Sequence, residues 1–230
     1  MKYLDHNVTD IRRRIADAAQ ASGRRAEDVT LLAAVKSGEI EEIRYLHREL
    51  GIRDLGENRV QQFLEHYEAL KDETGIRWHF IGSLQTNKVK YLIDKVCMIH
   101  SLDSLNLAKE IDKQAKKHGI VMDVLVEINI GEEENKSGIL ACDVEAFCDS
   151  VSEFENIRLR GFMTMAPKCE KKEDYIKYFS QIYKIALDIL AKKRHNIYSP
   201  VISMGMSESF EEAIECGSDI VRVGRSLFVK

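Results

Sequence analysis

A lysine stands where an apolar segment ends. Residues 29–36 read VTLLAAVK, so the only charge of this run is at its last position. In an extended strand Leu32, Ala34 and Lys36 share one face, and the small Ala34 leaves room beneath the amine. If Lys36 is partly buried, desolvation lowers its pKa, and the neutral amine can attack an aldehyde to form a Schiff base. The alternative is a lysine that extends from the strand end into water.

Two short glycine- and serine-containing loops follow apolar segments near the end of the sequence. They read SMGMSES, residues 203–209, and RVGRSLF, residues 222–228. Gly205 and Gly224 allow the backbone to approach a ligand closely, and free N–H groups at the start of the next turn favour an anion. The nearby hydroxyl groups belong to Ser203, Ser207 and Ser226. One such loop would indicate only a tight turn, but two together favour a phosphate site.

Arg222 alternates with two valines in the last apolar segment and shares a face with Gly224. One interpretation is a buried partner for an acidic residue at a strand end, such as Glu57 or Glu127. The other is a permanent cation that faces a pyridine nitrogen, where it would oppose protonation and weaken the ring as an electron sink. A phosphorylated aldehyde held between a phosphate site and a lysine is what pyridoxal 5′-phosphate supplies.

Strand-like and helix-like patterns alternate along the whole chain and must position these residues. A helical pattern at residues 4–22 comes first. The strand candidates are residues 29–36, 52–57, 76–82, 96–102, 121–130, 157–166, 198–205 and 219–228. Helical patterns follow the first seven, at residues 39–50, 58–73, 84–94, 104–119, 143–154, 173–193 and 207–217. In the fourth of these, Ser104 is a candidate N-cap and Gly119 a stop signal.

Eight such units predict a single α/β domain over residues 1–230, a closed (β/α)8 TIM-type barrel with an extra N-terminal helix. An open doubly wound sheet is the alternative, but no G-x-G-x-x-G follows the first strand. Closure makes the eighth strand the neighbour of the first. Lys36 would then lie beside the phosphate loops, at the end of the barrel where active sites form.

Composition argues against several classes of protein. The chain has 230 residues and a net charge of -4, and its basic runs at residues 12–14, 171–172 and 192–194 have acidic residues nearby, so no nucleic-acid surface is expected. No run reaches the length of a membrane span and no signal core follows Met1, which favours the cytoplasm and no membrane partner. Five cysteines without a CxxC pair and seven scattered histidines predict neither disulfides nor a metal site.

Several ordered segments resemble one family. They read AAVKSGEIEEIR, DLGENRVQ, IRWHFIGSLQTNKVK, IHSLDSLNLA, VEINIGEEENKSG, LRGFMTMAP and SMGMSESFEEAIECGSDIVRVG, and they run from about Asn7 to Phe228. Together they look like the pyridoxal phosphate homeostasis protein family. The resemblance implies the barrel of the alanine racemase N-terminal domain.

The resemblance also implies roles for individual residues. Lys36 would carry the cofactor as an internal aldimine, and Arg222 would face the pyridine nitrogen. The phosphate would be surrounded by Ser203, Gly224, Arg225 and Ser226. Asn58 and Met204 would be further cofactor neighbours, although Asn58 could also serve as the N-cap of the following helix.

The segment WHFIGSLQTNK is a hallmark of the family. Its polar residues are His79, Gln85, Asn87 and Lys88, and their role does not follow from the sequence; His79 could equally be a satisfied core histidine. Two departures from the family pattern affect the expected site. Ser37 and Gly38 stand where a threonine or tyrosine commonly follows the lysine, which predicts a looser loop. Arg225 stands where a small or hydroxyl residue is common, which leaves the phosphate contacts open.

The resemblance implies a binding protein that stores pyridoxal 5′-phosphate reversibly and can pass it to apo-enzymes, with an indirect effect on amino-acid and keto-acid balance. Racemisation needs an acid/base group on each face of the carbanion. Lys36 could serve one face, a tyrosine at the mouth or His79 is the remaining option for the other, and no catalytic residue is assigned. The related racemases add a second domain and a tyrosine across a dimer, whereas a monomer is expected here. A slow amino-acid racemase, or a cofactor-free barrel acting on a phosphorylated metabolite, are the alternatives.

Overall fold

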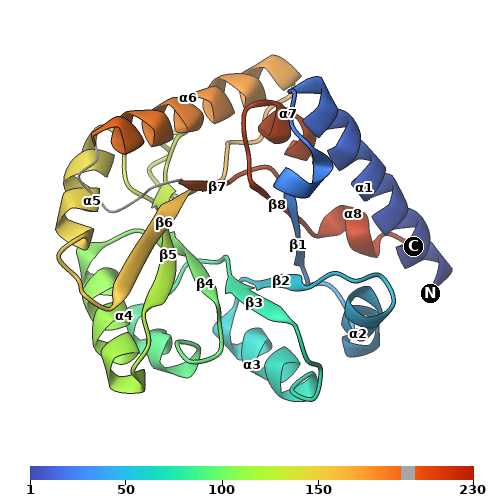
Figure 1. Ribbon diagram of the computed structural model, residues 1–230, viewed down its shortest axis with the longest axis horizontal. Coiled ribbons are helices and arrows are strands. Elements are labelled where there is room, and N and C mark those ends of the chain that lie inside the picture. Colours follow the sequence, from blue (N-terminus) through green and yellow to red (C-terminus); the bar gives the residue numbers. More distant parts are fainter. Residues whose placement is uncertain (193–199) are drawn as a thin grey trace.

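Eight parallel strands form a closed barrel in which each strand pairs with the next and β8 pairs with β1 (Figure 1). The computed structural model describes residues 1–192 and 200–230. The strands are β1 (Thr30–Ala34), β2 (Asp54–Glu57), β3 (Arg77–Phe80), β4 (Met98–Leu102), β5 (Met122–Ile128), β6 (Ile157–Thr164), β7 (Val201–Ser203) and β8 (Ile220–Val223). The predicted closed barrel is confirmed.

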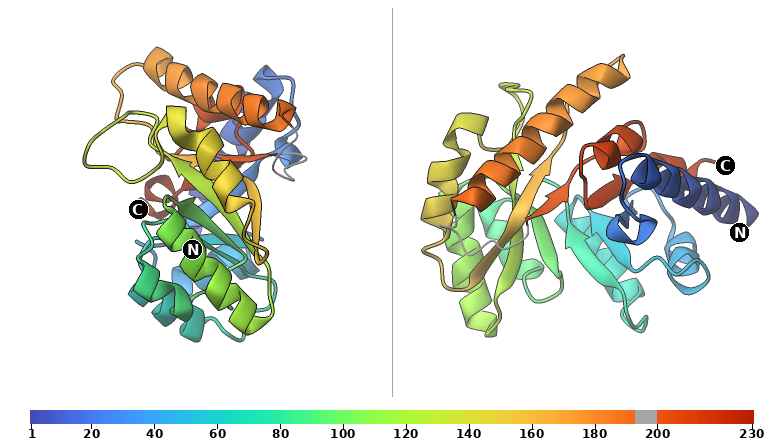
Figure 2. Two further views of the ribbon diagram at one scale, coloured as in Figure 1. Left: turned by 90° about the vertical axis from the view of Figure 1, so that its left-hand side faces the viewer. Right: turned by 45° about the horizontal axis from the view of Figure 1, so that its top comes forward.

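Helices surround the barrel on its outer side (Figures 1 and 2). The α-helices are α1 (Lys2–Ala21), α2 (Ile40–Arg48), α3 (Val60–Ala69), α4 (Leu105–His118), α5 (Val144–Val151), α6 (Lys172–Ala191), α7 (Phe210–Glu215) and α8 (Arg225–Phe228). Short 3-10 helices are η1 (Ala26–Asp28), η2 (Thr86–Tyr91) and η3 (Ala141–Asp143). Within the described residues, none of the helices is both long and apolar enough to cross a membrane.

The extra N-terminal helix packs against the last helices of the chain. Its buried residues Leu4, Val8, Ile11 and Ile15 recur every three to four positions, which places them on one face. This face lies against α7 and α8 (Figure 1). The amide of Asn7 donates hydrogen bonds to the backbone oxygens of Leu227 and Val229, at 2.9 and 2.8 Å. The start of the sequence therefore holds its end in place.

The predicted caps of α4 are confirmed. The Ser104 hydroxyl accepts a hydrogen bond from the N–H of Leu107 at 3.3 Å, and Gly119 ends the helix in the left-handed conformation with φ 66°. Each cap satisfies backbone groups that the helix itself leaves without partners.

Two predicted elements are wrong in type. Residues 84–94 form η2 and turns instead of an α-helix, although three of their buried side chains, Val89, Leu92 and Ile93, have the spacing of one helical face. The predicted last strand, residues 219–228, stops at Val223, and α8 takes its second half. The start of the predicted seventh strand, the end of the helix before it and part of the basic run at 192–194 lie outside the described residues.

Most of the apolar core lies between the strands and the surrounding helices, with large buried side chains such as Phe63, Phe80 and Phe162. A separate small apolar cluster, Met98, Leu125 and Met163, consists of residues of β4, β5 and β6. Other side chains in the barrel are polar, among them His79, His100, Ser203 and Arg222. The interior of this barrel is therefore partly polar, unlike the branched apolar layers that usually fill such a fold.

Candidate functional site

A pocket of about 280 Å³ lies at the carboxyl ends of the strands. Its walls come from the ends of β1, β2, β3 and β8 and from the segments that follow β6 and β7. Its polar lining residues include Lys36, Asn58 and Arg222. Its large apolar lining residues are Ile81, Met165 and Met206. This is the end of the barrel where the sequence predicted a site, and closure of β8 onto β1 brings Lys36 and Arg222 to one cavity.

Lys36 lies two residues after β1 and lines the pocket, with Ala34 below it as expected. Its side chain is exposed, so the expected partial burial is wrong. The next residues, Ser37 and Gly38, bring little side-chain volume to cover the amine. The backbone at Lys36 is fixed, because its carbonyl accepts a hydrogen bond of 2.8 Å from the Gln62 amide.

Arg222 is 4% exposed and its guanidinium is held by three hydrogen bonds. Nη1 donates to the carbonyl and the hydroxyl oxygen of Ser203, at 2.7 and 2.8 Å, and Nη2 donates to the carbonyl of Thr164 at 2.8 Å. Burial lowers the pKa of Arg222 to about 10, and attraction to Glu127 opposes this effect. Arg222 therefore stays a cation at neutral pH.

The two acidic residues considered as partners of Arg222 differ in their surroundings. Glu57 accepts a hydrogen bond of 2.6 Å from His66 of α3, on the outer side of the sheet. Glu127 is buried and accepts a hydrogen bond from the Ser137 hydroxyl at 2.9 Å. Burial raises the pKa of Glu127, and Arg222 and Lys136 favour its charge. Glu127 is therefore the carboxyl group that acts electrostatically on Arg222.

Asn58 lines the pocket and does not cap α3. That helix begins at Val60 after Arg59, and its N-cap residue Arg59 makes no side-chain capping hydrogen bond with the described residues. The Oδ1 atom of Asn58 is buried and has no partner among the described residues. Gly82 packs directly on the Asn58 backbone, since a Cβ at Gly82 would lie 2.2 Å from the Asn58 carbonyl oxygen. The Asn58 amide is therefore held at the pocket with hydrogen-bonding capacity to spare.

The two predicted phosphate loops lie side by side, and their residues make different kinds of contact. The Ser207 hydroxyl accepts a hydrogen bond from the backbone N–H of Ser226 at 3.3 Å. Gly224 packs against the Ala34 carbonyl, where an added Cβ would approach to 2.9 Å. Arg225 is exposed and forms an ion pair with Glu208 of the neighbouring loop. The loops at the ends of β7 and β8 thus meet next to β1.

Two predicted cofactor neighbours, Ser203 and Met204, do not line the pocket. Met204 is fully buried in the apolar core, whereas Met206, two residues later, lines the pocket. The Ser203 hydroxyl lies inside the barrel and contacts Arg222 and His100. Ser203 therefore supports Arg222, and strand alternation explains why Met204 faces the helices instead.

The four polar residues of the WHFIGSLQTNK segment separate. His79 is fully buried in the barrel, 2.9 Å from Asp54 and 3.0 Å from His100, so the core-histidine interpretation is correct. Gln85, Asn87 and Lys88 are exposed at and around η2. The sequence analysis missed His100, although it occupies the same face of its strand as Met98, and it also missed Met165 and Met206.

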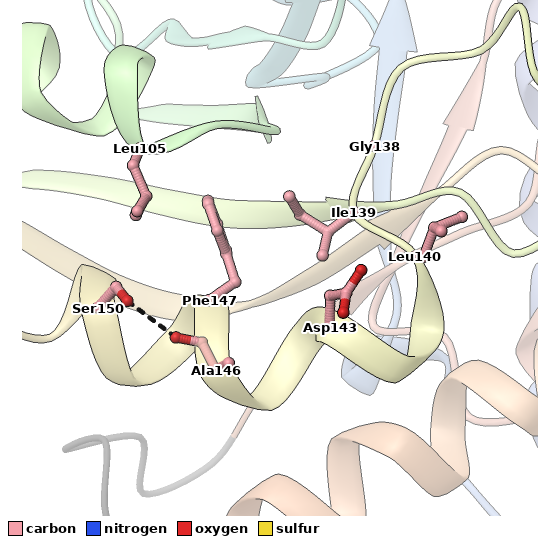
Figure 3. Close-up of a pocket in the computed structure, with 8 residues that line it drawn as sticks. All are labelled: Leu105, Gly138, Ile139, Leu140, Asp143, Ala146, Phe147 and Ser150. Carbon is pink, nitrogen blue, oxygen red and sulfur yellow. Dashed lines mark hydrogen bonds between the residues drawn. The ribbon is translucent and has the colours of Figure 1, made fainter.

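A second depression of about 420 Å³ lies outside the barrel, between the start of α4, the segment before η3, and α5 (Figure 3). Leu105, Ile139 and Phe147 give it an apolar lining, with Asp143 at its edge. It contains none of the residues that the sequence singled out. The cavity that joins Lys36 and Arg222 is therefore the candidate functional site.

Comparison with known proteins agrees with this fold. The family model described as "Alanine racemase, N-terminal domain" matches residues 4–230. A pyridoxal phosphate homeostasis protein of Aquifex aeolicus is 46% identical over 215 residues, which cover 94% of this chain and 92% of that protein. A protein of the same name from Escherichia coli is 34% identical and covers 99% of this chain and 97% of its own length.

A solved structure is also similar. PipY of Synechococcus elongatus, solved with PLP bound, superposes with a TM-score of 0.82 at 28% identity and covers 94% of this chain and 100% of its own. The match in sequence and in fold extends over nearly the whole length of each protein. The chain therefore belongs to the pyridoxal phosphate homeostasis protein family, whose barrel is that of the alanine racemase N-terminal domain.

Proposed function

We propose that this chain binds pyridoxal 5′-phosphate reversibly as a Schiff base on Lys36 and takes part in the homeostasis of this cofactor. The observation that carries the proposal is the single pocket that joins Lys36 with the buried cation Arg222. The names of the relatives and the PLP-bound PipY structure support the same ligand. Storage and release are the activities that this chemistry allows.

The residues present fit this ligand. Ala34 and Gly56 line the pocket together with Lys36 and Asn58, and the short side chain of Ala34 leaves space for a planar ring. Leu32 packs on Gly56, where an added Cβ would lie 2.4 Å from the Leu32 Cδ2 atom. Asn58 Oδ1 is buried and has no partner in the described part of the chain, so the amide can turn to donate to, or accept from, a ring substituent. The loops that carry Ser207, Gly224 and Ser226 lie beside β1, where a phosphate bound to them would be close to Lys36.

The covalent step needs only groups that are present. The neutral amine of Lys36 adds to the aldehyde carbon, a carbon–nitrogen double bond replaces the carbonyl bond, and the oxygen leaves as water. The step involves neither oxidation nor reduction. Its reverse, hydrolysis of the carbon–nitrogen double bond, releases the aldehyde. Exposure of Lys36 at the pocket gives water access to this bond, which suits reversible storage.

Arg222 favours binding over catalysis. A guanidinium that faces the pyridine nitrogen opposes its protonation, and a neutral ring is a weaker electron sink. Among the described residues that line the pocket, Lys36 and Arg222 are the only ionisable ones. Racemisation needs a second acid/base group on the opposite face, so the pocket fits a carrier better than a racemase.

The test is a titration of the purified chain with pyridoxal 5′-phosphate. We expect a new absorption band at the edge of the visible range, and borohydride reduction followed by peptide mass analysis should locate the ligand on Lys36. Lys36→Ala should abolish both signals because no other amine lines the pocket among the described residues.

Lys113→Ala is the matched control, because Lys113 is an exposed lysine of α4 whose substitution leaves the pocket intact. A band that persists in Lys36→Ala, or label on several surface lysines of the unaltered chain, would contradict the proposal. Exchange of the α-hydrogen of amino acids at enzyme-like rates would instead favour the racemase.

A further inference from the structure

A continuous row of polar side chains runs through the barrel from the pocket to the opposite end. It starts at Arg222, and Ser203 of β7, His100 of β4 and His79 of β3 follow; the row ends at Asp54, the first residue of β2. The successive distances are 2.8, 3.0, 3.0 and 2.9 Å. Ser203, His100 and His79 are fully buried. One row of hydrogen bonds thus connects residues of five strands.

The chemistry of the two end groups fixes the donor-to-acceptor direction of this row of hydrogen bonds. Arg222 can only donate and the Asp54 carboxylate can only accept. His79 therefore donates from Nε2 to Asp54, and a neutral His79 accepts at Nδ1 from Nε2 of His100. His100 then accepts at Nδ1 from the Ser203 hydroxyl, whose oxygen accepts from Arg222. All four hydrogen bonds point from the pocket toward the far end.

Protonation of His79 reverses the middle of the chain. An imidazolium donates from both nitrogens, so His100 must accept at Nε2 and carry its own hydrogen on Nδ1. His100 then donates to the Ser203 oxygen, which already accepts from Arg222. The Ser203 hydroxyl hydrogen must turn to another acceptor. A proton taken up next to Asp54 is thus felt at the atom that holds the guanidinium.

The surroundings of the two histidines favour this division of roles. Burial works against a charge on His79, but its hydrogen bonds to Asp54 and Cys97 outweigh burial and raise its pKa. Burial, together with the positive charges of His79 and Arg222, keeps the pKa of His100 well below its ordinary value. His79 therefore takes up the proton while His100 stays neutral and changes tautomer.

The charged and titratable groups around His79 come from several elements. Asp54 of β2 lies at 2.9 Å, the Cys97 sulfur just before β4 lies 3.4 Å from the same nitrogen, and His100 of β4 lies on the other side. Arg77 of β3 pairs with Asp54 at 3.3 Å. Asp54 is 13% exposed and Cys97 is exposed, so protons from solvent can reach this end of the chain.

We propose that Asp54, His79 and His100 are positioning residues for Arg222, and that protonation of His79 at the far end of the barrel changes how Ser203 holds the guanidinium in the pocket. We call this row of hydrogen bonds the relay; it consists only of residues of the protein and needs no ligand. Its effect on the ligand rests on the proposed binding of pyridoxal 5′-phosphate, because Arg222 would then transmit the change to the pyridine nitrogen.

The relay is tested first without any ligand. Proton–nitrogen correlation spectra of protein with isotope-labelled histidine report which ring nitrogen carries the hydrogen. As the pH falls, we expect His79 to become doubly protonated, and His100 to move its hydrogen from Nε2 to Nδ1 at the same midpoint. A His100 tautomer that stays unchanged while His79 titrates would overturn the relay, and so would a His79 that never titrates in the folded protein.

Substitution of the end group provides a second reading. Asp54→Asn keeps a hydrogen-bond acceptor but removes the charge, so the shared midpoint should move to lower pH by about one unit or more. Asp123→Asn is the matched control: Asp123 is a strand carboxylate of similar exposure that pairs with Arg158. A midpoint that is the same in Asp54→Asn and in the unaltered chain would contradict the assignment of Asp54.

The ligand arm uses pyridoxal 5′-phosphate with an isotope-labelled pyridine nitrogen. We expect its resonance to shift at the midpoint of His79, and the step to disappear in Ser203→Ala, which retains the Arg222 bond to the backbone oxygen of residue 203. A visible band with no such step would overturn transmission to the pocket. Absence of the band altogether would overturn the proposed function, while the ligand-free spectra still decide the relay.

Discussion

At the scale of single residues, the unusual feature is the number of polar side chains inside the barrel. Burial of an imidazole or a guanidinium is costly unless each polar atom finds a partner. His79, His100, Ser203 and Arg222 satisfy one another in a single row. Their contribution to stability therefore depends on their protonation states, and so on pH.

The two histidines affect stability in opposite directions. The folded-state pKa of His79 is raised above its ordinary 6.5, so its stabilising effect is complete below pH 6.5 and is lost as the pH rises through the raised pKa. The folded-state pKa of His100 is lowered. Its stabilising effect is therefore complete above pH 6.5, and it is lost as the pH falls below that value because the unfolded chain takes up a proton.

We expect the free energy of unfolding to decrease below pH 6.5, with a contribution from His100 of about 1.4 kcal/mol per pH unit. His100→Asn should be less stable at neutral pH, because it breaks the row, but its stability should fall less steeply with acid. Urea unfolding at a series of pH values measures both quantities.

His6→Asn serves as the control, since His6 is exposed on α1 and its replacement should leave the slope unchanged. Equal slopes in His100→Asn and the unaltered chain would show that another group is responsible for acid sensitivity.

At the scale of elements, the alternation of apolar and helical patterns was sufficient to predict all eight strands and the barrel. The pattern could not predict η2, because the buried residues Val89, Leu92 and Ile93 have the same spacing that they would have on an α-helix. It also could not separate β8 from α8, since each has four residues and only Gly224 lies between them.

The sequence likewise predicted some residues of the candidate site and missed others. Lys36 and Arg222 could be paired because barrel closure follows from the strand count. Met206 was missed in favour of Met204 because the exact end of β7 decides which methionine faces inward. His100 was missed because its role appears only when four strands are brought together.

Gly161 is needed for the pairing of β6 with β7. It has φ 148°, and a Cβ at this position would lie 2.1 Å from the Val201 carbonyl oxygen. Gly161→Ala should lower the free energy of unfolding by about 3 kcal/mol or more, because backbone atoms must move apart. Thermal and urea unfolding measure this loss.

Gly119 provides the matched substitution. It also has positive φ, at 66°, but no atom of residues 1–192 or 200–230 lies within 4 Å of an added Cβ. Gly119→Ala should therefore cost only the left-handed conformation, about 1–2 kcal/mol. Equal losses in the two variants would show that backbone contact at Gly161 is unimportant.

At the scale of the whole molecule, the first and last helices hold each other in place. Asn7 of α1 binds the backbone at Leu227 and Val229, and Gly38, just after Lys36, packs against the Phe228 ring. The loop that carries Lys36 and the segment that carries Ser226 are thus held by contacts at the same end of the barrel.

Asn7→Ala should loosen α8 without unfolding the barrel. We expect faster hydrogen exchange at residues 225–230 and about three- to tenfold weaker binding of pyridoxal 5′-phosphate, which corresponds to the loss of one or two hydrogen bonds. Exchange measured by mass spectrometry and titration of the visible band test this. His6→Ala, on the same helix, should change neither; unchanged exchange in Asn7→Ala would refute the coupling.

The pairing of β8 with β1 has a consequence for synthesis of the protein. Lys36 leaves the ribosome well before Arg222, with which it lines the pocket. A nascent chain with seven strands completed has the reactive amine without the guanidinium beside it. On the proposed function, we expect capture of pyridoxal 5′-phosphate to begin only after translation of β8, so that a bound ligand marks a chain whose barrel is closed.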